Sequence, residues 1–132
     1  MYEREEEIVR VAAAVIKNED EYLICQRGIN RRYGMKWEFP GGKTYPGEKL
    51  TECLERELWE ELNIEPVTYK ELKTIQAEYD DGGRFLITFF LVTKFNGELK
   101  NRAFEDIKWV TLEKIKEFDM LQGSTPILQY LK

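Results

Sequence analysis

The sequence contains no histidine, and this absence excludes several kinds of site at once. Triads with a histidine base, phosphohistidine chemistry and histidine-rich metal centres all depend on that side chain. Any proton transfer or metal binding by this chain must therefore use carboxylates, lysine or tyrosine.

Cysteine is also scarce, because the chain has only Cys25 and Cys53. Two thiols without a CxxC spacing make neither a disulfide framework nor a zinc site. Both cysteines lie in apolar-patterned segments, so we expect two buried thiols in a reducing compartment.

Long apolar runs and excess positive charge are missing as well. No apolar stretch approaches the roughly 20 residues that cross a bilayer, and the opening MYEREEE is acidic where a secretion signal would be basic and then apolar. The net charge of −5 disfavours binding of a nucleic-acid polymer through its phosphates. We therefore expect a cytoplasmic monomer or homodimer with no membrane partner. Its ligand should be a small anion that binds together with a metal ion.

The 132 residues are 42% apolar and 34% charged, which predicts one compact, folded domain over residues 1–132. Periodicity and turn residues predict the following elements: a hairpin of residues 8–17 and 22–27, a short strand at 37–39, a helix at 48–62, a hairpin of residues 68–78 and 84–95, a strand near 108–110, and helices at 112–118 and 125–131. This order predicts an α/β fold, a three-layer α/β/α sandwich with a mixed sheet covered on both faces.

The helix expected at residues 48–62 departs from a simple amphipathic pattern. At about 100° per residue, its apolar side chains form one stripe, which comprises Leu50, Cys53, Leu54, Leu58 and Leu62. Glu57 and Glu61 fall inside this stripe, about 20° to either side of Leu50, whereas Glu52 and Glu55 fall on the solvated side. Burial of two like charges is costly unless a cation, a proton or an aqueous cleft compensates for it.

Glu57, Glu60 and Glu61 place three carboxylates within one helical turn. Oxygen-only clusters of this kind suit hard cations, Mg²⁺ first and Mn²⁺ as an alternative. A merely solvated glutamate-rich helix is the other interpretation, and the position of two glutamates in the apolar stripe argues against it. Gly41 and Gly42 precede the helix and let the backbone approach a phosphate or a metal, although a glycine pair alone is usually just a turn.

The segment from Gly42 to Ile64 resembles the signature of the Nudix hydrolases, G-x5-E-x7-R-E-U-x-E-E-x-G-U. The matching positions are Gly42, Glu48, Arg56-Glu57-Leu58, Glu60-Glu61 and Ile64. Asn63 stands where the family usually has glycine, and asparagine is the next-best residue for a left-handed helix end. Gln26-Arg27 and the run from Trp37 to Lys43 further resemble the MutT-like branch, so the resemblance covers most of the chain.

Enzymes of that branch hydrolyse nucleoside triphosphates to the monophosphate and pyrophosphate with divalent metal ions. The resemblance implies a set of metal ligands formed by the Gly41 carbonyl, Glu57, Glu60 and Glu61. It places Glu48 and Arg56 behind these ligands, with Arg56 orienting the carboxylates through its fork of donors. Glu105 stands where the family often has a further carboxylate, as a ligand or base, and a solvated loop glutamate is the alternative there.

The resemblance also implies residues that contact the substrate. Arg27 resembles the phosphate-contacting arginine of the family, and Glu38 and Lys43 belong to the run from Trp37 to Lys43 that resembles the MutT-like branch. Ser124 stands where relatives that read a base edge commonly have Asn or Asp, which argues against bidentate recognition of an oxidised guanine. Three aromatic residues could stack on a base but are more often packing residues: Tyr33, Tyr79 and Phe89.

Three functional interpretations follow from the sequence. The leading one is a Mg²⁺-dependent nucleoside triphosphate pyrophosphohydrolase acting on CTP or a modified nucleotide such as 8-oxo-dGTP, with Glu57, Glu60 or Glu105 as general base. The second is a hydrolase of a nucleoside diphosphate derivative such as ADP-ribose. The third is a non-catalytic nucleotide-sensing module, whose usual mark would be loss of signature glutamates, and none is lost here.

Overall fold

The computed structural model describes residues 8–132. Its strands are β1 (Val9–Asn18), β2 (Glu21–Gln26), β3 (Trp37–Glu38), β4 (Gly41–Lys43), β5 (Glu65–Glu78), β6 (Arg84–Asn96) and β7 (Asp106–Thr111). Its helices are α1 (Leu50–Leu62), the single turn α2 (Leu112–Ile115) and the 3₁₀-helices η1 (Gln122–Ser124) and η2 (Pro126–Tyr130). No helix within residues 8–132 is long and apolar enough to cross a membrane.

Strand β1 is the central strand of a mixed sheet. It runs parallel to β6 from Val9 to Ile16, and it is antiparallel to β4 at residues 11–13 and to β2 at its far end. The order across the sheet is β3-β2-β1-β6-β5, with β4 also beside β1 and β7 beside β2. Both predicted hairpins are confirmed.

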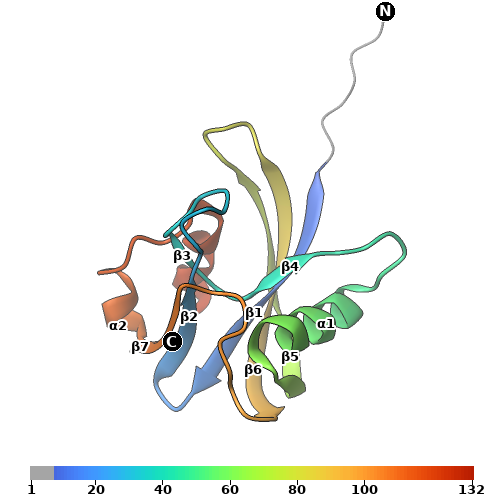
Figure 1. The fold of residues 1–132 in the computed structure, drawn as a ribbon, viewed down its shortest axis with the longest axis vertical. Helices are drawn as coiled ribbons and strands as arrows, with labels where there is room; N and C mark the ends of the chain where they lie inside the picture. Colours follow the sequence, from blue (N-terminus) through green and yellow to red (C-terminus); the bar gives the residue numbers. More distant parts are fainter. Residues whose placement is uncertain (1–7) are drawn as a thin grey trace, which may run out of the picture.

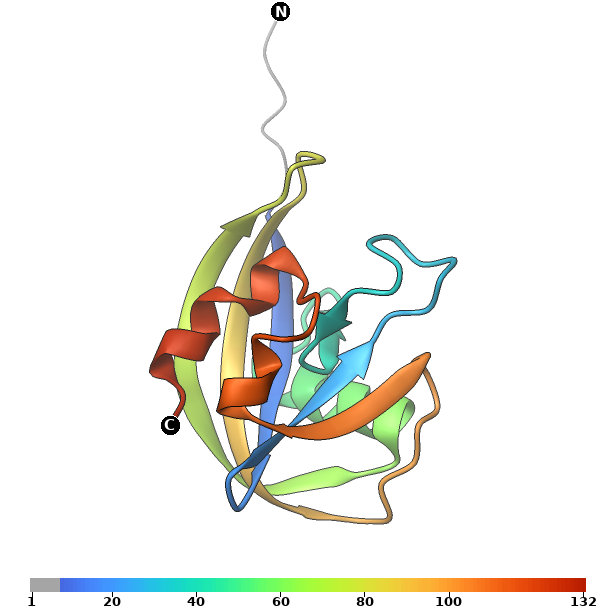
Figure 2. The same cartoon turned by 90° about the vertical axis from the view of Figure 1, so that its left-hand side faces the viewer.

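Both faces of β1 are covered, which explains why its sequence is apolar without alternation. Ala12, Ala14 and Ile16 pack with the buried side of α1, whereas Ala13 and Val15 face a second cluster on the opposite side. Figures 1 and 2 show α1 on one face of the sheet and the C-terminal helical segment on the other. The predicted α/β fold with a mixed sheet between two helical layers is confirmed.

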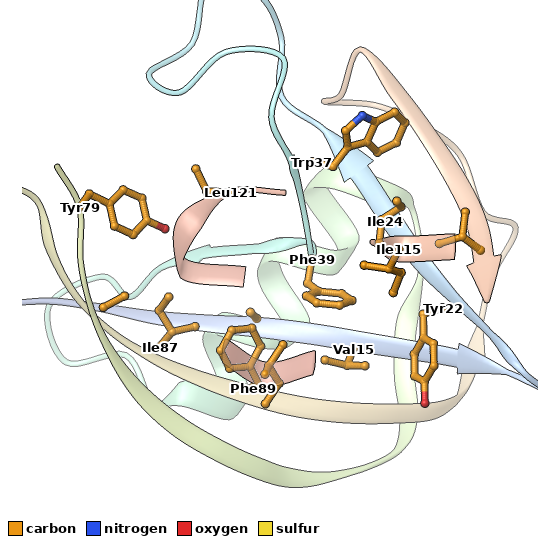
Figure 3. Packing of buried hydrophobic residues seen from close by; sticks show 14 residues of the cluster. Val15, Tyr22, Ile24, Trp37, Phe39, Tyr79, Ile87, Phe89, Ile115 and Leu121 are labelled. Carbon is orange, nitrogen blue, oxygen red and sulfur yellow. The ribbon is translucent and has the colours of Figure 1, made fainter. Parts of the chain in front are cut away.

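The cluster on the C-terminal side of the sheet extends along β1 and β6. Figure 3 shows Tyr79 and Ile87 at one end of this cluster and Tyr22 and Ile115 at the other. The Tyr22 end is closed, because the Tyr22 hydroxyl donates a hydrogen bond to the Lys132 carbonyl at 2.7 Å. The opposite end adjoins the cleft described below.

Two of the predicted helices differ in form from the structure. The helix expected at 112–118 is a single α-turn, and the one expected at 125–131 is the 3₁₀-helix η2. Leu128 N–H bonds to the Thr125 carbonyl at 3.1 Å, which is an i to i+3 bond. Such short segments gain little from α-helical hydrogen bonding, so burial of Ile115 and Ile127 decides their geometry.

Candidate active site

The glycine pair of β4 forms the floor of the candidate site. Because β4 pairs with β1, Gly41 and Gly42 lie directly beneath the face of α1 that carries Glu57 and Glu61. Gly41 N–H donates a hydrogen bond to the Glu61 carboxylate at 3.0 Å. A methyl group on Gly42 would lie 2.5 Å from the carboxyl carbon of Glu57. The two glycines therefore leave room for two inward-facing carboxylates.

Helix α1 is fixed at both ends, which sets the direction of these carboxylates. At its start, the Glu52 carboxylate accepts a hydrogen bond from Lys49 N–H at 2.9 Å. At its end, Asn63 has the left-handed conformation, with φ 63° and ψ 30°. The Asn63 side chain also donates to the Glu98 carbonyl at 2.9 Å and accepts from Arg102. The expectation that asparagine replaces the usual glycine without loss of the helix end is confirmed.

Arg56 connects three of the signature glutamates. Its Nε and Nη2 donate to the two carboxylate oxygens of Glu48 at 2.7 and 2.9 Å. Its Nη1 donates to Glu57 at 2.8 Å and to Glu60 at 3.3 Å. The Arg56 bonds, with a backbone bond from Tyr45, lower the pKa of Glu48 to about 2. Arg56 thus orients the carboxylates of α1 through its fork of donors.

The inward-facing glutamates have an excess of negative charge. Burial, together with the nearby charges of Glu57 and Glu38, raises the pKa of Glu61 to about 9. Burial also raises the pKa of Glu57, although Arg56 opposes this effect. Carboxylates in this position favour a bound cation or a proton. The helical-wheel prediction that these two side chains point inward is confirmed.

The glutamates are not gathered into a preformed cluster. Within residues 8–132, no group of three or more acidic or cysteine side chains is arranged as a metal site. The hydrogen bonds explain this, since Arg56 engages Glu57 and Glu60 while Gly41 N–H engages Glu61. The donor set nevertheless fits a hard divalent cation, because it is made of oxygen atoms and because Glu61 has no cationic partner among the described residues to hold its charged form.

A cleft of about 490 Å³ connects this acidic floor to an apolar end. The acidic end is lined by Gly41, Gly42, Lys43, Glu57 and Glu61. The apolar part of the lining is formed by Tyr79, Phe85, Ile87 and Leu121, which belong to the cluster on the C-terminal side of the sheet, and Ser124 also lines the cleft. Ser124 is buried there, and the Tyr79 hydroxyl accepts a hydrogen bond from Gly123 N–H at 3.1 Å. A charged chain and a flat apolar group could occupy the two ends together.

The cleft brings together most of the residues singled out in the sequence. Of the eleven candidate catalytic, metal-binding and substrate-binding residues, seven line it, namely Arg27, Glu38, Gly41, Lys43, Glu57, Glu61 and Ser124. Gly42 and the three candidate stacking residues, Tyr33, Tyr79 and Phe89, line it too. Glu48 and Arg56 lie behind the acidic floor. The Glu60 side chain is 50% exposed, and Glu105 is also exposed, although its neighbours Ala103 and Phe104 line the cleft.

Arg27 has protein partners within the cleft. Its Nη1 donates to the Glu38 carboxylate at 3.0 and 3.2 Å, and its Nε donates to the Arg32 carbonyl at 2.7 Å. The side chains of Arg27 and Glu38 are only 16% and 17% exposed. The guanidinium expected to contact phosphate therefore forms a half-buried ion pair that also anchors the loop 28–36.

Sequence reasoning assigned no role to Arg31 or Asp81. Arg31 lines the cleft, and the only signal for it was the high positive charge of the loop 28–36. Asp81 looked like a turn residue, yet its carboxylate accepts hydrogen bonds from Arg32 at 2.7 and 2.9 Å. It also accepts from the Tyr33 hydroxyl at 2.6 Å. These contacts join the loop 28–36 to the β5–β6 turn, and we call them the Asp81 latch.

The comparisons with known proteins extend over nearly the whole chain. The model of the NUDIX domain matches residues 7–131. The chain is 29% identical over 125 residues to the 8-oxo-dGTP diphosphatase of Escherichia coli (strain K12), which covers 94% of the chain and 96% of that protein. It is 29% identical over 123 residues to the CTP pyrophosphohydrolase of the same organism, at 92% and 91% coverage. The structure of the MutT protein from Methanosarcina mazei Go1 matches with a TM-score of 0.82 at 28% identity, covering 97% of this chain and 93% of that one.

Proposed function

This chain belongs to the NUDIX family, and we propose that it hydrolyses a nucleoside triphosphate to the monophosphate and pyrophosphate with the help of a divalent metal ion. One observation carries the proposal. Glu57 and Glu61 face the backbone of Gly41 and Gly42 at the acidic end of a cleft whose other end is apolar and aromatic. That combination suits a substrate with a polyphosphate chain and a base.

The metal would be held by oxygen atoms from α1 and β4. We assign as ligands the Gly41 carbonyl, Glu57, Glu60 and Glu61, with Glu105 as a further ligand or as the base. Mg²⁺ suits these hard donors, and Mn²⁺ is the alternative. When bound, such ions neutralise phosphate oxygens and make an attacking water more acidic.

The side chains around the metal have distinct tasks in this proposal. Arg56 holds Glu57 at 2.8 Å, which fixes the carboxylate in one orientation. Because the chain has no histidine, Glu57, Glu60 or Glu105 would take the proton from the attacking water. Lys43 lines the acidic end of the cleft, where its ammonium group would attract the phosphates.

The base would occupy the apolar end of the cleft. Tyr79 and Phe85 offer aromatic surface, and their ring centroids lie 4.8 Å apart. Ser124 is buried at this end and offers one hydroxyl to a base edge. The names of the relatives make CTP and 8-oxo-dGTP the first candidates.

The proposal is tested by measuring pyrophosphate and phosphate release from a panel of compounds. The panel comprises canonical nucleoside triphosphates, 8-oxo-dGTP, ADP-ribose and a dinucleoside polyphosphate, each assayed with Mg²⁺, with Mn²⁺ and with EDTA. We expect metal-dependent release of pyrophosphate from a triphosphate. Turnover of ADP-ribose alone would replace the proposed substrate class, and no turnover of any compound would contradict the proposed activity.

A further inference from the structure

Four cationic side chains line the cleft, and they differ in what they already bind. They are Arg27, Arg31, Arg32 and Lys43. Arg27 is paired with Glu38 at 3.0 Å, and Arg32 is paired with Asp81 at 2.7 Å. Among the described residues, Nη2 of Arg27 and Nη1 of Arg32 have no partner, but the charge of each guanidinium is already compensated by a carboxylate.

Arg31 has no such competitor. Among residues 8–132, no carboxylate lies within 4.0 Å of its guanidinium, and its side chain makes no hydrogen bond to the described chain. The backbone of Arg31 is nevertheless fixed, because its N–H donates to the Gly28 carbonyl at 3.1 Å. A Cβ added at Gly28 would lie 3.6 Å from the Cγ of Arg31, so the side-chain stem passes close to this glycine. An exposed guanidinium thus projects into the cleft from an anchored turn.

Arg31 lines the same cleft as Glu38, Glu57 and Glu61, and so it shares the region in which phosphate oxygens would lie. A planar guanidinium with free donors can bind a phosphate group through two parallel hydrogen bonds.

We propose that Arg31 contacts the polyphosphate of the substrate, while Arg27 serves as a positioning residue that anchors the loop carrying Arg31. The assignment rests on the proposed function for the identity of the anion. Its physical basis is that the whole Arg31 guanidinium is free among the described residues. Arg27 instead uses its Nε to hold the Arg32 carbonyl and its Nη1 to hold Glu38, which compensates its charge.

The test compares Arg31→Ala and Arg31→Lys with a control on the same loop, Lys36→Ala. Lys36 is paired with Asp119 at 2.8 Å and does not line the cleft. We expect Arg31→Ala to raise KM for the active triphosphate by about fivefold or more, with kcat within about twofold, because an exposed charged contact has a modest effect. Arg31→Lys should be intermediate, and Lys36→Ala should match the wild type.

A binding measurement separates this inference from the proposed activity. Titration of inorganic pyrophosphate into the Mg²⁺-loaded protein by calorimetry should show weaker binding for Arg31→Ala, and added NaCl should shrink the difference. Unchanged KM and unchanged pyrophosphate affinity in Arg31→Ala would overturn the assignment, as would an equal loss in Lys36→Ala. A wild type that binds pyrophosphate through Arg31 but hydrolyses nothing in the panel would instead contradict the proposed function alone.

Discussion

Three glutamates within one turn of α1 occupy three different environments. The Glu57 side chain is 14% exposed and is held by Arg56, whereas that of Glu60 is 50% exposed and only weakly held. Glu61 faces Gly41 and has no cationic partner among the described residues. The same substitution at each of the three glutamates should therefore have a different effect on activity and stability.

Glu57 is the position at which we expect the largest loss of activity with the fold preserved. Glu57→Gln keeps the size of the side chain and can still accept a hydrogen bond from Arg56, but it removes the charge that the metal requires. We expect kcat to fall by at least about 100-fold, since metal and base functions contribute on that scale. The measurement is steady-state hydrolysis together with circular dichroism. Glu55→Gln, on the solvated side of α1, is the control, and near-normal turnover of Glu57→Gln would contradict the assignment.

Gly42→Ala should act through Glu57 and not through the backbone. The added methyl group would meet the Glu57 carboxylate at 2.5 Å, so the carboxylate must move. We expect a loss of at least about tenfold in kcat, because small displacements of a reacting group are costly. A double-mutant cycle is the measurement: Gly42→Ala should add little in the Glu57→Gln background. Additive losses would show that Gly42 acts independently of Glu57.

The individual helices and hairpins could be predicted from the sequence because each depends on residues that are close together in the chain. The periodicity of α1 showed that Glu57 and Glu61 point inward, and the predicted hairpin of residues 68–78 and 84–95 corresponds to β5 and β6. The pairing of Arg27 with Glu38 could not be predicted in this way, because it depends on the register of β2 and β3. The Asp81 latch joins residues 49 positions apart, so no sequence window contains it.

The Asp81 latch leads to a prediction about the loop that carries Arg31. Asp81→Asn loses the charge that holds Arg32 and Tyr33, while Asp80→Asn, an exposed neighbour in the same turn, is the matched control. We expect faster hydrogen exchange in residues 28–36 and a KM raised about threefold, with little change in thermal stability, because exposed ion pairs contribute little. Unchanged exchange in the loop would show that the latch does not order it.

The latch should also respond to acid in a defined direction. The hydrogen bonds from Tyr33 and Gly83, together with Arg32, lower the pKa of Asp81 to about 2 from an ordinary value of 3.8. A depressed pKa stabilises the folded state above the ordinary value, and this contribution is lost as the pH falls through about 2. The latch is therefore intact at any pH at which the enzyme would be assayed.

On the scale of the whole molecule, the site lies where two parts of the sheet share one strand. β4 pairs with the first half of β1 and β2 pairs with its end, so β1 joins the acidic floor to the strands that hold Arg27 and Glu38. The stability of the protein and the charge of its site are therefore coupled. A buried carboxylate in the cleft is stabilised by a bound metal ion. When the metal is removed, the charged form of this carboxylate destabilises the folded state.

This coupling predicts how the metal-free protein responds to pH. The folded pKa of Glu61, about 9, is above the ordinary value of 4.5, so between these values the folded state binds a proton that the unfolded state has lost. Stability in EDTA should therefore fall as the pH rises from about 5 to 9. Glu61→Gln removes this dependence, and at pH 8 it should melt at least about 3 °C above the wild type.

Thermal melts at pH 5 and pH 8, in EDTA and in Mg²⁺, provide the measurement. Mg²⁺ should raise the melting temperature of the wild type at pH 8, because a bound cation neutralises the buried carboxylate, and it should do so much less in Glu61→Gln. Glu55→Gln is the control, since Glu55 is exposed on the solvated side of α1 and is not an assigned ligand. If Glu61→Gln and the wild type lose stability in parallel between pH 5 and pH 8, Glu61 is not the group that couples metal binding to folding.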